Sequence, residues 1–180
     1  MIENKYANYT LQKLVVRNVP FRVRIEHYCQ AHFFRLANNE FSSRLLQTLI
    51  ENSDNFRIYT LQACKRNLSR MIEKISCVFL IVAAIRATKC EDEYHFMFSV
   101  LMPSPKRWLG KKYYKRILVS ILQTCSAKTL NKAYNLLEMS TNMISFFQEK
   151  YSTYILLAII ERGHKATVKK VCSMIQNNFN

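Results

Sequence analysis

The stretch Tyr6-Ala-Asn-Tyr-Thr-Leu-Gln-Lys-Leu-Val15 recurs 35 residues later as Phe41-Ser-Ser-Arg-Leu-Leu-Gln-Thr-Leu-Ile50. Each copy opens on an aromatic residue and then places apolar residues three positions apart, which is the spacing of neighbours on one face of a helix. Both stretches are therefore predicted to be helices, and to be two copies of the same structural unit.

Three weaker copies follow, with the sequences Cys77-Val-Phe-Leu-Ile-Val-Ala-Ala-Ile-Arg86, Tyr113-Tyr-Lys-Arg-Ile-Leu-Val-Ser-Ile-Leu122 and Tyr151-Ser-Thr-Tyr-Ile-Leu-Leu-Ala-Ile-Ile160. The five copies start at residues 6, 41, 77, 113 and 151, so the intervals are 35, 36, 36 and 38 residues. Their expected buried pairs are Leu11/Leu14, Leu46/Leu49, Val82/Ile85, Leu118/Ile121 and Leu156/Ile159. A period near 36 residues is typical of stacked helical repeats.

Amphipathic stretches between the copies predict a second helix in each unit, over residues 21–30, 55–65, 91–102, 126–139 and 164–175. Two shorter stretches, 31–38 and 142–148, predict a short third helix. The expected fold is all-α, a right-handed solenoid of about five repeats in a single domain over residues 1–180. The expected units are 1–38, 39–73, 74–109, 110–147 and 148–180.

Composition and charge narrow the classes of protein. Only 2 Gly and 3 Pro occur among 180 residues, too few for the many turns of a β-sandwich or barrel, and Gly110 and Gly163 are too far apart for a phosphate-binding loop. Lys and Arg number 27 against 12 Asp and Glu, for a net charge of +15. An excess of this size indicates a polyanionic partner, either nucleic acid or an acidic membrane surface.

The sequence predicts no bound metal or other cofactor, and it predicts that the protein is not an enzyme. The nearest approach to a metal cluster, His27, Cys29 and His32, has no standard zinc spacing. Cys29 and Cys64 lie 35 residues apart, which favours equivalent packing roles for reduced thiols. The longest apolar run, 77–85, is too short to cross a bilayer, and no signal peptide is evident. These features predict a cytoplasmic protein, alternatively a nuclear or nucleolar one, with no membrane association.

The two best copies resemble the RNA-reading helix of a Pumilio (PUF) repeat. In that family each repeat offers a five-residue window to one RNA base: the first and fifth residues hydrogen-bond the base edge, and the second stacks between neighbouring bases. The resemblance covers nearly the whole chain as a repeat pattern, but only two windows are complete. These are Asn8, Tyr9 and Gln12 in the first copy, and Ser43, Arg44 and Gln47 in the second.

The resemblance also implies which bases are read. Asn with Gln corresponds to uracil and Ser with Gln to adenine. Because the N-terminal repeats of the family read the 3′ end of the RNA, the first two windows are expected to prefer 5′-AU-3′. Independently of the family, two polar groups and one flat side chain within about one helical turn suit a base with a polar edge and a π-face.

The other windows are incomplete. The third window is placed at Phe79, Leu80 and Ala83, and none of these side chains can hydrogen-bond a base edge. The fourth is Lys115, Arg116 and Val119, and the fifth is Thr153, Tyr154 and Leu157. Arg116 and Tyr154 are retained as candidate RNA-binding residues because both types can stack, whereas Lys115 and Thr153 are expected to be ordinary surface residues.

The predicted function is that of a sequence-selective single-stranded RNA-binding protein. By resemblance it would act as a monomer on mRNA 3′-UTR elements and control translation and stability, with protein effectors as possible further partners. Two alternatives stay open. One is a degenerate basic Pumilio-like protein that binds structured RNA non-specifically in ribosome biogenesis, and the other is a HEAT-like scaffold that binds protein.

Overall fold

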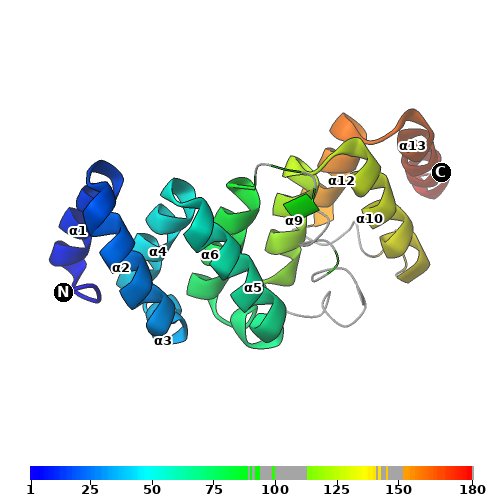
Figure 1. Ribbon diagram of the computed structural model, residues 1–180. Coiled ribbons are helices and arrows are strands. Elements are labelled where there is room, and N and C mark those ends of the chain that lie inside the picture. The colour runs from blue at the N-terminus through cyan, green and yellow to red at the C-terminus, as the bar shows by residue number, and fades with distance from the viewer. Residues whose placement is uncertain are drawn as a thin grey trace. The chain divides into compact units, whose positions relative to one another are not determined.

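The computed structural model describes residues 1–88, 113–140 and 152–179, together with residues 90, 92, 93, 99, 142 and 145. These described residues form ten helices and no strand, which confirms the all-α prediction (Figure 1). The chain divides into two compact parts, Met1–Thr88 and Lys89–Asn180.

The N-terminal part consists of two layers of helices. Figure 1 shows α1, α4 and α6 following one another along one side, here called the A layer, with α2 and α5 along the other, the B layer. Within the A layer, α4 packs between α1 and α6. The bounds are α1 Lys5–Arg17, α2 Val19–Ala31, α3 Phe33–Ala37, α4 Glu40–Asn52, α5 Asp54–Met71 and α6 Ile75–Arg86.

The first two repeats share a three-helix pattern. In the first repeat, α2 and the short α3 are separated at His32, whose backbone lies at φ −115°, ψ 20°. In the second repeat, α5 is broken at Asn67, 35 residues later, at φ −134°, ψ 21°. The second half of α5 is therefore the counterpart of α3. The short third helix expected over 31–38 is confirmed.

Side-chain caps set where the A-layer helices begin. The Asn4 side chain accepts from the backbone N–H groups of Tyr6 and Ala7, and the Asn39 side chain accepts from those of Phe41 and Ser42, all at 3.0 Å. These bonds satisfy donors that a helix start leaves unpaired. Lys74 holds the third equivalent position, again 35 residues on, but makes no side-chain cap.

The apolar stripe is buried in α4, which packs between α1 and α6, and in α6. Leu46 and Leu49 of α4 are fully buried, and so is Ile85 of α6. Leu14 of α1 is the exception, because 41% of its surface is exposed. The equivalent residue of the second repeat, Leu49 of α4, is fully buried, so this position is covered in the second repeat and largely uncovered in the first. The expectation that Leu14 is buried was therefore wrong, although its partner Leu11 is buried.

The C-terminal part contains four described helices: α9 Tyr114–Thr124, α10 Ala127–Ser140, α12 Ser152–Arg162 and α13 Lys165–Phe179. Leu118, Ile121 and Ile159 are buried as expected, and Leu156 is half-buried. The Arg162 guanidinium donates to the carbonyl oxygens of Leu122 at 2.8 Å and Cys125 at 2.6 Å, so α12 satisfies the end of α9. The helices expected over 91–102 and 142–148 lie largely outside the described residues.

The cysteines of the first two repeats pack as expected from their spacing. Cys29 and Cys64 are fully buried, and burial raises the pKa of each thiol to about 12. The described residues contain no group of three potential metal ligands. Among the described helices, none has the length and apolar character that a bilayer crossing requires.

Substitution of equivalent leucines should have unequal effects on stability. Leu49→Ala opens a cavity between α1 and α4 and should reduce the free energy of unfolding by about 2–5 kcal/mol. Leu14→Ala, at the same repeat position but largely exposed, should cost less than about 1 kcal/mol. Urea denaturation followed by far-UV circular dichroism measures both. Equal losses would contradict the assignment of Leu14 to an uncovered helix face.

Candidate functional site

The two complete windows lie in neighbouring helices of the A layer. Asn8, Tyr9 and Gln12 belong to α1, and Ser43, Arg44 and Gln47 belong to α4. In both helices the window occupies the fourth, fifth and eighth residues after the capping Asn. Because α1 and α4 pack against each other, the fold brings these six side chains, predicted from sequence, into one layer.

The three positions of a window differ in burial in the same way in both helices. The first residue is nearly enclosed, with 2% of Asn8 and 3% of Ser43 exposed. The second residue is exposed: 64% for Tyr9, and Arg44 likewise. The fifth residue, Gln12 or Gln47, is half-buried. In each window, therefore, the planar side chain of the second residue is exposed, and the polar side chains of the first and fifth residues lie deeper in the layer.

A chain of hydrogen bonds orients the polar groups of the first window. The Asn8 amide Nδ2 donates to the Ile2 carbonyl at 2.7 Å, and Gln12 Nε2 donates to Asn8 Oδ1 at 2.6 Å. A backbone carbonyl can only accept, so the Ile2 contact determines which way the Asn8 amide points, and Asn8 in turn orients Gln12. The Thr48 hydroxyl of α4 donates to the Arg44 carbonyl at 3.1 Å and lies 3.4 Å from Gln12 Oε1, so α4 borders this chain of bonds.

The second window borders a depression of about 360 Å³ between α4 and the start of α6. Ser43, Arg44 and Gln47 line it from α4, and Phe79 lines it from α6. Lys74, Ile75 and Ser76 close the same depression at the beginning of α6. The Ser43 hydroxyl donates to the Glu40 carbonyl at 2.9 Å, which leaves its oxygen lone pairs for a further donor.

The third window lies one residue earlier than the sequence spacing predicted. Counting from the cap at Lys74, the equivalent residues are Val78, Phe79 and Val82. Burial agrees, since Val78 and Leu80 are fully buried whereas 42% of Phe79 is exposed. Phe79 therefore occupies the second, exposed place of the window, and Leu80 belongs to the core. The repeat spacing alone does not reveal this register, because the third cap is Lys74, which lacks the capping signature of Asn4 and Asn39.

The C-terminal part holds the fourth and fifth windows. In α9, Lys115 is buried, Arg116 exposed and Val119 half-buried, the same order as in the complete windows. Burial lowers the pKa of the Lys115 ammonium, and its enclosed position corrects the expectation of an ordinary surface residue. In α12, Thr153, Tyr154 and Leu157 are all exposed.

Cations are distributed over both layers of the N-terminal part. In the A layer, the Lys13 ammonium lies 5.3 Å from the ring centroid of Tyr9, and Lys74 borders the depression. In the B layer, α5 exposes Lys65, Arg66 and Arg70. Positive charge is therefore not confined to the layer that carries the windows.

Asn8 and Tyr9 should contribute very differently to stability. Asn8→Ala leaves the Ile2 carbonyl and the Gln12 amide without their partner, and should lower the free energy of unfolding by about 1–3 kcal/mol. Tyr9→Ala removes an exposed ring and should change it by no more than about 0.5 kcal/mol. Chemical denaturation measures both. A large loss for Tyr9→Ala would show that the ring is a packing residue and not available to a ligand.

No family model matches the sequence, and no curated protein is significantly similar to it. Three solved structures illustrate the structural likeness. The PUF-8 complex with PBE-RNA aligns with a TM-score of 0.86 at 16% identity, covering 99% of this chain and 52% of that one. The Puf3 RNA-binding domain bound to a Cox17 RNA 3′ UTR site aligns with a TM-score of 0.85 at 11% identity, and the alignment covers 97% of this chain and 51% of the Puf3 chain. The yeast Puf5p domain bound to MFA2 RNA aligns with a TM-score of 0.78 at 12% identity, and the alignment covers 97% of this chain and 50% of the Puf5p chain.

The chain spans about half the length of these solved domains. At such low identities the likeness establishes the fold. The layered helices, the 35-residue register and these alignments together show that the chain has the fold of a Pumilio (PUF) helical-repeat domain.

Proposed function

We propose that the protein binds single-stranded RNA along the A layer, with each complete window receiving one base. The observation that carries this proposal is the depression bordered by Ser43, Arg44 and Gln47 on α4 and by Phe79 on α6. It combines polar groups, a guanidinium plane and an aromatic ring around one hollow. A splayed base needs this combination, because it has a hydrogen-bonding edge and two stacking faces.

The second window is proposed to take adenine. Its base would lie between the side chains of Arg44 and Phe79, with its edge toward Ser43 and Gln47. An amide such as Gln47 can donate and accept at once, as adenine requires. Lys74, at the rim of the same depression, supplies a cation for the phosphate backbone.

The first window is proposed to take uracil, so that the two windows read 5′-AU-3′. Its base would lie between Tyr9 and Arg44. Asn8 and Gln12 are held in one orientation by the bond to Ile2, and each amide keeps one N–H and one lone pair for the base. Preorganised groups lose less entropy on binding, which favours selective contacts.

The wider role is proposed as post-transcriptional regulation by a non-enzymatic monomer that binds mRNA 3′-UTR elements in the cytoplasm. In support, the similar Puf3 domain is bound to a 3′ UTR recognition sequence. Arg116 and Tyr154 are proposed as further stacking residues, since both are exposed on the helices α9 and α12 that carry the later windows.

A second candidate function, binding of structured RNA without base preference, is favoured by the cations of the second helices. Helix α13 exposes Lys165, Lys169 and Lys170 and contains no acidic residue. Titrations at several salt concentrations separate the two functions. Each phosphate contacted contributes about −0.7 to the slope of log K against log salt, so binding mainly through bases gives a shallow slope. A steep slope with equal affinity for scrambled RNA would support the second candidate.

Removal of the Phe79 ring should weaken RNA binding selectively. Stacking on an aromatic side chain is worth about 1–3 kcal/mol per base, so Phe79→Ala should raise the Kd for an AU-containing oligomer by about 5- to 150-fold. Phe34→Ala is the matched control, because Phe34 is equally exposed, at 42%, but belongs to α3, outside the A layer. Equal effects of the two substitutions in fluorescence anisotropy would refute the stacking role.

Gln47→Glu should change the base preference of the second window and preserve binding. By the resemblance, Ser with Glu reads guanine, because a carboxylate accepts from the N–H groups of the guanine edge. Discrimination by one good base contact is about 1–3 kcal/mol. Paired titrations with 5′-AU-3′ and 5′-GU-3′ oligomers should show the preference reversed. If both affinities fall together, or neither moves, Ser43 and Gln47 do not form a reading pair.

A further inference from the structure

The window of α6 offers a base an aromatic ring and no hydrogen-bonding group. Phe79 holds the second place of this window, and 42% of its surface is exposed. The first and fifth places are held by Val78 and Val82, of which 0% and 8% are exposed. In the two complete windows the same places carry amide or hydroxyl side chains. The third window therefore keeps a stacking group and lacks the polar groups that would contact a base edge.

Rotation of α6 about its axis would not bring a polar group into the window. From residue 77 to residue 85 the helix has the sequence CVFLIVAAI, in which no side chain carries an N–H or O–H group. The buried Cys77 also holds the helix in place, because its Sγ lies 3.5 Å from the Ala37 carbonyl oxygen and 3.7 Å from Asn38 Oδ1. The apolar character of the window is therefore a property of this whole stretch of helix.

An apolar window treats the edge and the face of a base differently. An edge placed against Val82 would lose its hydrogen bonds to water and gain none from the protein. All four bases carry donors or acceptors on this edge, so the loss applies to each of them. The π-face is also common to all four bases, and stacking on an aromatic ring is tolerant of base identity. A base that stacks on Phe79 with its edge in water avoids the loss and keeps the gain.

The charges beside Phe79 also act without regard to the base. Lys74 at the start of α6 and Arg44 of α4 line the depression that Phe79 borders, together with one carboxylate, that of Glu40. Contacts between cations and phosphate groups contribute affinity and carry no sequence information, because every nucleotide has the same phosphate. Stacking and charge can therefore hold a nucleotide here without selecting it.

We propose that the third repeat holds one nucleotide of any base by stacking it on Phe79, next to the two bases that the complete windows select. The recognised element is then 5′-NAU-3′, in which N contributes affinity and no selectivity. Val78 and Val82 are the residues that remove the selectivity, because they occupy the two places that contact a base edge in the complete windows. This inference rests on the proposed RNA binding and names what its third position accepts.

Base selection at N is measured with the unsubstituted 180-residue protein. Short RNA oligomers that contain xAU and differ only at x carry A, C, G, U or an abasic ribose there, and fluorescence anisotropy gives each Kd. The Kd values for the four bases should differ by less than about five-fold, whereas the abasic ribose should raise the Kd by about 5- to 150-fold, the range for stacking on one aromatic side chain. A larger preference for one base, or an abasic oligomer that binds as well as the others, would overturn the proposal.

The double variant Val78→Ser/Val82→Gln gives the third window the residues of the second. Ser43 is only 3% exposed at the equivalent place, so a serine suits a buried first position. This variant should prefer A over C at x by about 5- to 150-fold, as one good base contact allows. Val82→Gln alone leaves the core residue in place and should give a preference in the same direction. Val23→Gln on α2, where 45% of the valine is exposed in the B layer, is the matched control and should give none. If both third-window variants fold by circular dichroism and still bind all four bases equally, the proposal is wrong.

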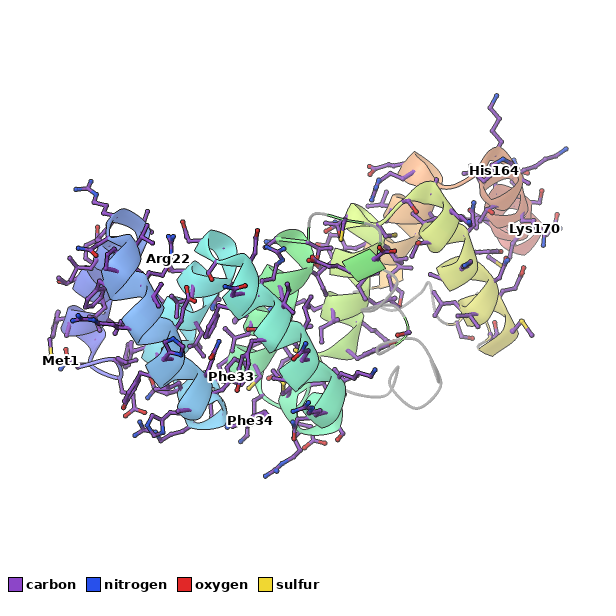
Figure 2. All side chains as sticks on the ribbon, viewed as in Figure 1. Met1, Arg22, Phe33, Phe34, His164 and Lys170 are labelled. Carbon is purple, nitrogen blue, oxygen red and sulfur yellow. The ribbon has the colours of Figure 1, made fainter. Side chains whose placement is uncertain are left out.

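Removal of the ring tests the stacking at x. In Phe79→Ala the difference between a base and an abasic ribose should disappear. Phe34→Ala should keep the difference in full, because Phe34 is exposed to the same 42% but belongs to α3 (Figure 2). A difference that survives Phe79→Ala would contradict the proposed contact.

The A and U of the same oligomers separate this inference from the proposed function. If replacing A and U costs no affinity, the proposed reading of RNA fails, and this inference fails with it. If A and U are selected and x is selected as well, the proposed function stands and only the inference about the third position is overturned.

Discussion

Burial of apolar side chains between successive A-layer helices is the constraint on which the rest of the N-terminal part depends. Leu46 and Leu49 of α4 are fully enclosed between its neighbours, and Ile85 is equally enclosed in α6. A single helix cannot bury such a face, so each repeat is stable only against the next one. A constant interval of 35 residues keeps these faces in contact. It also keeps all the remaining positions of each repeat aligned with their equivalents in the next repeat.

The windows are a consequence of this packing. Once the apolar face of an A helix is turned inward, the residue four places after the cap is enclosed and the next residue is exposed. Asn8 and Ser43 take the enclosed place, and Tyr9, Arg44 and Phe79 take the exposed one. The same rotation of the helix therefore places the planar groups at the surface of the A layer and the first polar residue of each window beneath them, without any loop geometry.

The sequence by itself determined the helical class, the repeat period and the short helix at 31–38, because apolar periodicity and Asn caps are local signals. It also determined which six residues lie together in the windows of α1 and α4, and their role in reading RNA stays a prediction. The tertiary structure alone decided that Phe79 is the exposed residue of the third window, that Asn8 is held by the Ile2 carbonyl, and that Leu14 is uncovered. The physical reason is that spacing tells which side chains share a helix face. Which face is covered, and in which register, depends on the neighbouring helix.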